Sequence, residues 1–533
     1  MATDEARVLA AAGIFGEHAW GGGIAAVAEE STEALAPAVA RLVAEGWLRP
    51  VTPSRFPGEV EYALDARVAE AAVAWLPEPA RRRANTQAGR WLDAAGELDT
   101  AVVAVHLAHG DTPEEAIPWC AEAARVAKAD GRLDAVLGWS QRAIDLGADP
   151  DTKLAMRLLQ LEAHDGRGET DDAERCAQEM WALARPGSAL KYRAGAALAV
   201  LAMRRQRPEA LAELGPALQV ALQGPSEDNA EAALAPALFP ILYAGLFPLG
   251  ELLLGRLEAI QAAGTHPDAD FPARVSIARA IWANFNGDSE RYLEESLRAA
   301  EAFATLGDAR RELSSRVNAG VAYVLLGDAD AAVEALQRAA SRADAEGLRR
   351  LGMAARSNLG NALLLARRPD DARATLERAL AESEALADAR LVATGQVYLA
   401  RVLRAGGALD EARALVERAL PQLGPSASLW VLACALHADL QMIRGEFDAA
   451  LASVRSGFEV LDRMRSVEEG EAELRLAQVD AFDAIGDGEA ARAALQRARE
   501  RLLARAGRIQ DPARRARFLG RIPAHARTLV LGR

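Results

Sequence analysis

The chain has 533 residues with a formal net charge of −14, and 51% of them are hydrophobic while only 5% are aromatic. That length exceeds what one hydrophobic core normally serves, so we expect either several domains or an elongated repeat protein. The acidic balance argues against a nucleic-acid partner, because phosphate contacts need a basic surface.

Three cysteines, Cys120, Cys176 and Cys434, lie far apart and lack the spacing of a metal site. We therefore interpret them as buried apolar residues in a reducing compartment. The first residues, MATDEAR, are acidic where a signal peptide would be basic, which favours a cytoplasmic protein. No metal and no cofactor is expected.

Residues 1–65 have a pattern of their own. Helices are expected over 6–15 and 31–45, and two short strands joined by a Pro/Gly turn over 47–64. This order predicts a small winged-helix-like module. The module carries four arginines against ten acids, so we do not expect it to bind DNA. The glycines at 21–23 are expected to form a loop.

Residues 66–100 are expected to form connecting helices. Shortly after them, His106 and His109 stand one helical turn apart and could share a metal ion. No third ligand stands nearby in the sequence, so a structural role is favoured.

A unit of about 40 residues recurs roughly ten times between residues 101 and 505. Each unit is expected to be a pair of helices joined by a turn. Seven of the eight clearest turns begin with glycine, which readily takes the left-handed conformation that ends a helix. The turns begin at Gly131, Gly168, Gly287, Gly327, Arg367, Gly407, Gly445 and Gly486.

An acid stands three residues after the start of each of these turns. This position is the first turn of the second helix, where a carboxylate meets unpaired N–H groups. The acids are Asp134, Asp171, Glu290, Asp330, Asp370, Asp410, Asp448 and Glu489.

Small and large apolar residues recur at fixed places in the unit. In one unit they are Leu359, Gly360, Leu363, Ala372, Leu376 and Ala379, and in the unit before it Gly320, Tyr323, Ala332, Leu336 and Ala339. Their order resembles the tetratricopeptide repeat, although the period is longer and the match weakens between residues 190 and 290. The resemblance implies an all-α fold, a tetratricopeptide-like α-solenoid of about ten helix pairs over 101–505.

Polar residues recur on the first helix of three successive units. They are Asn318, then Asn358 and Asn361, then Tyr398, Arg401 and Arg404. The resemblance implies that they face the concave surface of a superhelix, where such repeats hold an extended peptide. An asparagine can pair with both a peptide N–H and a carbonyl group, which suits this role. The alternative is a row of ordinary polar residues on a solvated helix face.

Residues 232–250 contain nineteen residues without a charge, which is close to the length of a membrane span. Pro236, Pro240 and Pro248 interrupt this stretch, and repeats continue on both sides of it. Buried helices are therefore favoured, and no membrane association is expected.

Residues 506–533 are expected to form a basic C-terminal tail. From Arg499 to Arg533 the chain holds ten arginines against two acids. Such a tail is either solvated or a site for an acidic partner.

Five runs in the first part of the chain form a further pattern. They read VLAAAGIFGEHAW, LVAEGWLRP, FPGEVEYAL, LPEPARRRANTQAGRWL and VVAVHLAHGDTPEEAIPWCAEAARVA. They resemble the region after the nucleotide-binding domain of STAND-type signalling ATPases, bacterial proteins in which a winged helix leads into a repeat sensor arm. The final run, FLGRIPAHARTLVLGR, is similar to the end of family members fused to serine/threonine kinases. The chain departs from the family at Asp65 and at Asn85 or Thr86, where histidines are usual.

The catalytic motifs of those enzymes are absent from the sequence. It has no G-x-x-x-x-G-K-[ST] loop, none of its three lysines follows a glycine-rich turn, and no kinase motif is found. The resemblance is thus to a sensor region without its nucleotide-binding and kinase domains.

The sequence therefore favours a non-enzymatic protein–protein interaction scaffold or adaptor, with a protein or peptide partner held in the concave groove. A separate ATPase, kinase or effector subunit is a further candidate partner. The alternative is the sensor or regulatory arm of a signalling ATPase or kinase system, which binds a small-molecule or protein signal. A hydrolase would need a pocket of converging polar groups that the sequence does not indicate.

Overall fold

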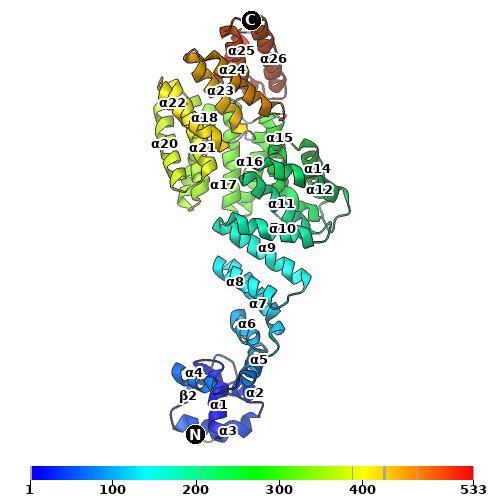
Figure 1. Ribbon diagram of the computed structural model, residues 1–533, viewed down its shortest axis with the longest axis vertical. Coiled ribbons are helices and arrows are strands. Elements are labelled where there is room, and N and C mark those ends of the chain that lie inside the picture. The colour runs from blue at the N-terminus through cyan, green and yellow to red at the C-terminus, as the bar shows by residue number, and fades with distance from the viewer. Residues whose placement is uncertain are drawn as a thin grey trace. The chain divides into compact units, whose positions relative to one another are not determined.

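The structure is a computed structural model that describes residues 3–205, 207–386, 388–423, 428–464, 466–467 and 469–531. They form two compact units, Met1–Arg185 and Pro186–Arg533, each with its own core. Helices dominate both units (Figure 1).

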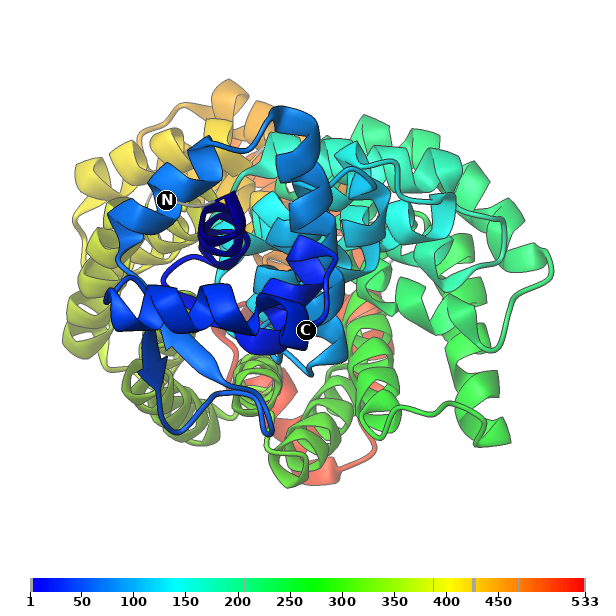
Figure 2. The same ribbon diagram turned by 90° about the horizontal axis from the view of Figure 1, so that it is seen from below.

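The first unit begins with three helices and three short strands. They are α1 (Thr3–Gly13), β1 (His18–Trp20), α2 (Gly21–Ala28), α3 (Thr32–Ala44), β2 (Arg49–Val51) and β3 (Glu61–Ala63). The central strand is β3, and Tyr62 on it lies opposite Ala19 of β1 and Pro50 of β2 in antiparallel register. The strands lie beside the dark-blue helices in Figure 2. The core of these elements includes Val8, Leu9, Ile24, Leu42 and Leu48.

The helices expected over 6–15 and 31–45 and the two strands expected within 47–64 are all present. The expected loop at 21–23 is wrong, because these glycines form the first turn of α2. There the amide of Gly22 donates a hydrogen bond of 2.8 Å to the Glu59 carboxylate, which also lies favourably at the positive end of the helix. This long-range partner overrides the weak helix propensity of glycine. The assignment of residues 1–65 as a winged-helix-like module stays a prediction.

The first unit continues with helices that pack in succession. They are α4 (Ala66–Ala74), α5 (Glu78–Ala94), α6 (Thr100–Ala108), the 3₁₀ helix η1 (Pro113–Ala116), α7 (Ile117–Ala129), α8 (Leu133–Asp145), α9 (Pro150–Arg167) and α10 (Thr170–Leu183). Helix α4 packs against α1, and α5 packs against both α2 and α6. Helices α7 to α10 then pack each against the next.

The second unit holds the most regular repeats. Its elements are α11 (Ala189–Arg204), α12 (Pro208–Gln223), η2 (Ala230–Ala237), α13 (Leu238–Tyr243), α14 (Phe247–Ala263), α15 (Phe271–Phe285), α16 (Ser289–Thr305), α17 (Ala309–Leu325), α18 (Ala329–Ala345), α19 (Arg349–Leu365), α20 (Pro369–Ala385), α21 (Ala389–Ala405), α22 (Leu409–Leu423), α23 (Ser428–Ile443), α24 (Phe447–Leu461), α25 (Glu471–Ala484), α26 (Gly488–Ala506), α27 (Pro512–Gly520) and α28 (Pro523–Leu531). Every helix from α15 to α26 packs against the next one along the chain. The predicted fold class, an all-α solenoid of tetratricopeptide-like helix pairs, is confirmed.

The turns within the helix pairs have the predicted conformation. Backbone φ is positive at all seven turn glycines and also at Arg367, where it is 59°. The eight acids that follow all lie in the first turn of the second helix. Because a left-handed conformation is unfavourable for a residue with a Cβ atom, the fold imposes it on Arg367.

Glycines on the first helices allow close packing against the second helices. A Cβ atom on Gly360 would lie 2.3 Å from Cγ of Leu376, and one on Gly320 would lie 2.5 Å from Cγ of Leu336. The leucine side chains therefore occupy the space that any larger residue would need. This explains the small and large positions that the repeat pattern identified.

The uncharged stretch 232–250 forms η2, α13 and the start of α14. Leu238, Ile241 and Leu242 of this stretch are fully buried in the second unit. Among the described residues, no helix is both long enough and apolar enough to cross a membrane.

The basic C-terminal segment is folded, so the expectation of a solvated tail is wrong for the described residues up to Leu531. Phe518 on α27 is buried, and three arginines of the segment, Arg514, Arg517 and Arg527, pair with acids of the same chain. Arg514 lies 2.9 Å from Glu290, and Arg517 lies 3.1 Å from Asp328. Acidic groups of the repeats thus pair with part of the basic segment, and an acidic partner for the remaining arginines stays a prediction.

Candidate functional site

A cavity of about 450 Å³ lies on the first helices of the repeats in the second unit. Helices α17, α19, α21, α23 and α25 all contribute to its wall, together with α26, α28 and the residues just before α25. Among the described residues, the second helices α18, α20, α22 and α24 contribute none. The cavity therefore lies mainly on the first helices of the units, which carry the candidate binding residues of the sequence analysis.

One position of the repeat supplies a polar wall residue in four successive units. It stands six residues before the turn residue, and its occupants are Asn361, Arg401, Asp439 and Asp480. The position three residues before the turn also lines the cavity, as Val324, Leu364, Arg404 and Met442. Residues three apart on a helix share a face, so the register of the repeat alone brings these side chains together.

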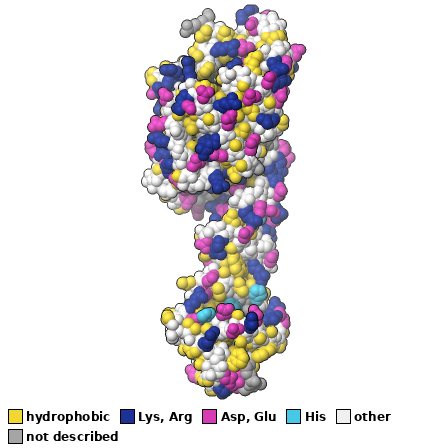
Figure 3. Space-filling model, turned by 90° about the vertical axis from the view of Figure 1, so that its left-hand side faces the viewer, with side chains coloured by type: hydrophobic (Ala, Val, Ile, Leu, Met, Phe, Trp, Pro, Cys, Tyr) yellow, Lys and Arg dark blue, Asp and Glu magenta, His cyan; other side chains and the backbone are white. Residues whose placement is uncertain are grey.

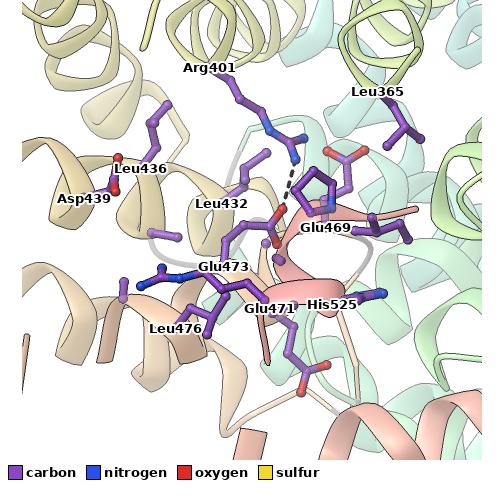
Figure 4. A pocket seen from close by; sticks show the side chains of 18 of the residues that line it. Leu365, Arg401, Leu432, Leu436, Asp439, Glu469, Glu471, Glu473, Leu476 and His525 are labelled. Atoms are coloured by element: carbon purple, nitrogen blue, oxygen red, sulfur yellow. Dashed lines mark hydrogen bonds and ion pairs between the residues drawn. The ribbon is translucent and has the colours of Figure 1, made fainter. Parts of the chain in front are cut away.

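Leucines form the apolar wall of the cavity. Leu432, Leu436 and Leu476 surround its polar centre in Figure 4. Leu432 and Leu436 are four apart on α23, so they form one continuous apolar strip on that helix. The second unit thus offers apolar surface next to a row of charged groups.

A hydrogen-bonded network crosses the cavity between three helices. The Arg401 guanidinium donates to Oδ1 of Asn361 at 2.9 Å. It also donates to the Glu473 carboxylate at 2.9 Å (Figure 4). The Asn361 amide donates in turn to Glu469 at 2.7 Å. Because Asn361 is only 4% exposed, its amide is fixed by these two partners.

Two further arginines of the cavity form forked ion pairs. Arg404 binds both carboxylate oxygens of Asp439, at 2.5 and 2.9 Å. Arg527 binds both oxygens of Asp480, at 2.8 and 2.6 Å. Forked pairs of this kind fix the orientation of both side chains.

Glu471 begins α25 and is buried beneath the cavity, with 3% of its side chain exposed. Burial by itself would raise its pKa, but Arg505, Arg501 and Arg475 around it outweigh this and lower the pKa. The carboxylate oxygens lie 2.8 Å from Arg501 and 2.9 Å from Arg475. Glu471 therefore remains ionised and holds three guanidinium groups together.

His525 on α28 forms part of the same wall. Its Nδ1 lies 2.7 Å from the carbonyl oxygen of Phe518. Burial first, and the nearby Arg505 second, lower the pKa of His525 to about 4. The imidazole is therefore neutral at physiological pH.

The structure separates the six predicted peptide-binding residues into two groups. Asn361, Arg401 and Arg404 line the cavity. The other three do not. Asn358 donates to the carbonyl of Ala354 on its own helix at 3.0 Å, Tyr398 is 6% exposed within the core, and Asn318 is half-buried on α17. Their role in binding a peptide stays a prediction.

Sequence reasoning missed several wall residues of this cavity. Asp439 and Asp480 could have been found, because they occupy the same repeat position as Asn361 and Arg401. Glu469, Glu473 and His525 lie outside that register, so no periodic signal marks them. They reach the cavity because α25 and α28 fold against the first helices.

The histidines near residue 106 have structural partners. Nδ1 of His106 lies 3.1 Å from Oδ1 of Asn85, and Nδ1 of His109 lies 2.8 Å from the carbonyl oxygen of Val105. Within the described part of the chain, the grouping close enough for a metal ion is His164, Glu169 and Asp172. Glu169 and Asp172 already pair with Arg167 and Arg175, at 2.7 and 2.5 Å, so arginines balance their charge.

No protein-family model matches the chain, and no curated protein matches its sequence. Solved structures do show likeness. The chain is similar to a Rap protein complexed with competence and sporulation factor, at 14% identity and a TM-score of 0.45, over 65% of this chain and 99% of that one. It is similar to NprR in complex with its cognate peptide NprX, at 13% identity and a TM-score of 0.42, over 63% of this chain and 95% of that one. It is also similar to a STAND protein with a tetratricopeptide repeat sensor from Pyrococcus horikoshii, at 13% identity and a TM-score of 0.38, over 87% of this chain and 63% of that one.

Proposed function

We propose that this chain is a non-enzymatic interaction scaffold that holds a peptide or a protein segment in the cavity of its second unit. The observation that carries the proposal is the convergence of one repeat position from α19, α21, α23 and α25 on a single cavity. Side chains at equivalent positions of successive helices contact an extended ligand at several points along its length. A single catalytic centre would contact its ligand at one point.

The chemistry of the wall suits a peptide. Leu432, Leu436 and Leu476 provide the apolar surface that anchors side chains, and burial of such surface is the main source of affinity. Next to it, the Arg401 guanidinium provides donors, and the Asn361 amide provides both a donor and an acceptor. These groups already pair with Glu469 and Glu473, so a ligand exchanges one set of hydrogen bonds for another. The polar row therefore selects the register of the ligand more than it adds affinity.

A selection of peptides from a random library against the full-length protein tests the proposal. Fluorescence polarisation then measures how each selected peptide binds to variants. Ala405→Trp fills the cavity from an exposed position, so we expect at least a tenfold loss of affinity. Asn361→Ala and Arg401→Ala should each weaken binding by about 1 kcal/mol, which is roughly fivefold.

Asn318→Ala and Asn358→Ala separate the cavity from the wider row of residues that the sequence predicts, because these asparagines lie on the same set of helices but outside the cavity wall; weaker binding by either variant would support its predicted role. They should bind the selected peptides as the wild-type protein does. If Ala405→Trp binds every peptide with unchanged affinity, the cavity is not the binding site and the proposal fails.

The volume of the cavity favours one alternative. At about 450 Å³ it falls within the range of small-molecule sites, which suits the sensor arm of a signalling ATPase or kinase system. Under that alternative, peptide selection yields no ligand, whereas purification from the native cell yields an ATPase or kinase subunit together with the chain.

A further inference from the structure

Helices α27 and α28 connect the two ends of the row of first helices, α17, α19, α21, α23 and α25, in the second unit. At one end, α27 packs closely on the turn between α17 and α18, because a Cβ atom on Gly327 would lie 2.8 Å from the carbonyl oxygen of Arg517. At the other end, α28 packs against α25 and α26. An extended ligand that follows the row therefore meets this segment.

Helix α28 and the residue before it form one side of the cavity. The residues of this segment in the wall are Ile522, Pro523, Ala524, His525 and Arg527. Arg527 also binds both carboxylate oxygens of Asp480 on α25. The helix therefore covers the α25 end of the row.

The cavity is shorter than the row of first helices. The five helices contact one another in succession, and packed helices lie roughly 8–10 Å apart, so the row spans about 30–40 Å. An extended peptide needs about ten residues to cover that distance. The cavity, at about 450 Å³, has the volume of a small-molecule site. With α28 in place, it thus holds only part of such a peptide.

Helix α27 is firmly attached to the repeats. Phe518 is 1% exposed, in a core cluster with residues of α15, α16 and α17. Arg514 pairs with Glu290, and Arg517 pairs with Asp328. Both the apolar core and two ion pairs therefore hold this helix in place.

Helix α28 buries much less apolar surface. Its buried residues are Ala524, His525 and Thr528, whereas Val530 and Leu531 are exposed. Leu529 is partly buried and packs against the cluster that holds Phe518. Segments with few buried apolar contacts open locally at a lower free energy than core elements. Helix α28 can therefore detach while α27 stays in place, with Arg521 and Ile522 between them as the hinge.

The ion pair of α28 is exposed to solvent. Half of the Arg527 side chain and 30% of the Asp480 side chain are exposed, so the pair adds little to the attachment of the helix. Acidic and basic side chains are interspersed over the face of the second unit that Figure 3 shows. The potential of that face has no dominant sign, so the attachment of α28 depends mainly on its own packing.

We propose that α28 is a displaceable cover of the peptide cavity, which closes one end of the groove until a peptide of about ten residues displaces it. This inference rests on the proposed function, because it concerns the same cavity. A peptide of about four residues binds beneath the cover and leaves it in place. Only the fraction of molecules with α28 detached binds the longer peptide, so its apparent affinity is lowered by that fraction.

Amide hydrogen exchange of the full-length protein without any ligand tests whether the cover detaches. Leu529→Ala removes packing of α28 without changing a wall residue of the cavity, so α28 should exchange at least threefold faster than in the wild-type protein. Leu531→Ala is the matched control, because it makes the same change at an exposed position of the same helix. The exchange of α27 should not change in either variant. Equal protection of α27 and α28 in the wild-type protein would overturn the proposal.

Peptide length tests whether the cover limits binding. Random libraries of four-residue and twelve-residue peptides, selected against the full-length protein, supply the probes for fluorescence polarisation. Leu529→Ala should bind the twelve-residue peptides at least threefold more tightly than the wild-type protein does, and the four-residue peptides equally well. Leu531→Ala should bind both as the wild-type protein does. Twelve-residue peptides that bind Leu529→Ala and the wild-type protein equally would overturn this inference alone. Failure of both libraries to yield a ligand would reject the proposed function as well.

Discussion

The cavity of the second unit and a smaller cavity of about 370 Å³ in the first unit differ in how their charged groups are balanced. In the second unit, Arg404 pairs with Asp439, Arg527 with Asp480, and Arg401 with Glu473, so three arginines of the wall each have a carboxylate partner in the same wall. In the first unit, the wall holds three carboxylates, Glu17, Glu61 and Glu97, and one arginine, Arg55. The comparison teaches that arginines and carboxylates are nearly equal in number in the wall of the repeat cavity, whereas carboxylates outnumber arginines three to one in the wall of the smaller cavity.

Both cavities also differ in origin. The wall of the larger one follows the repeat, since Asn361, Arg401, Asp439 and Asp480 occupy one position of successive units. The wall of the smaller one comes from strand, turn and helix segments without a shared pattern. Wall residues of the larger cavity can therefore be predicted from the repeat period, whereas those of the smaller cavity cannot.

The largest expected effect is on protein stability, and it differs between variants of two buried glutamates, Glu471 and Glu97. Glu471→Ala leaves three arginines without their shared carboxylate, so it should lower the free energy of unfolding of the second unit by about 3–5 kcal/mol. Glu97→Gln should lower that of the first unit by less than about 1 kcal/mol, because its partner Arg55 is half-exposed. Urea unfolding measured at pH 7 checks both. Similar losses from the two variants would contradict the contrast in charge balance.

The next effect concerns the buried histidine of each cavity. His106 and His525 have folded-state pKa values of about 4, below the ordinary value of 6.5. The unfolded chain therefore binds these protons first as the pH falls. The stability they contribute is complete above about pH 6.5 and is lost between about pH 6.5 and 4, by up to about 3 kcal/mol for each residue.

Unfolding free energies measured at intervals from pH 7 to pH 4 check this prediction. The variants His106→Gln and His525→Gln should each show a weaker dependence on pH than the wild-type protein, the former in the first unit and the latter in the second. If both variants show the same dependence of unfolding free energy on pH as the wild-type protein, the two imidazoles are not buried in the neutral form.

Gly360→Ala tests the close packing of the repeat units behind the larger cavity. The added Cβ atom would lie 2.3 Å from Cγ of Leu376, so we expect a loss of about 2 kcal/mol in the stability of the second unit. Adding Leu376→Ala should relieve part of the clash, although the cavity left by that change has its own penalty. Gly255→Ala is the control, because no atom lies within 4 Å of its added Cβ. Equal stability of the two single variants would contradict the packing argument.

Arg367→Gly gives the smallest expected effect, and in the opposite direction. Of the eight clearest repeat turns, only the one at Arg367 begins without glycine, and φ of Arg367 is 59°. Glycine takes this conformation without strain, so the change should stabilise the second unit by about 1 kcal/mol. A rise in the unfolding midpoint checks it, and a fall would show that the arginine side chain itself stabilises the turn.

The repeat pattern alone determined most of the fold. Turn glycines such as Gly327 and the acids that follow them, such as Asp330, act within one helix pair, so local chemistry predicted where helices end and begin. Half of the predicted binding residues line one cavity because the repeat period places them at equivalent positions. Asn361, Arg401 and Arg404 share a helix face through the repeat period.

Only the tertiary structure decided the rest. Gly22 is helical because Glu59, far along the chain, accepts its N–H, and the basic C-terminal segment is folded because Glu290 and Asp328 lie where its arginines can pair. The buried Glu97 accepts on Oε1 from Arg55, which lies 42 residues away in the sequence, as well as from the backbone N–H of Asp99. Contacts between residues so distant in sequence leave no periodic trace, because they depend on where whole helices and strands come to lie.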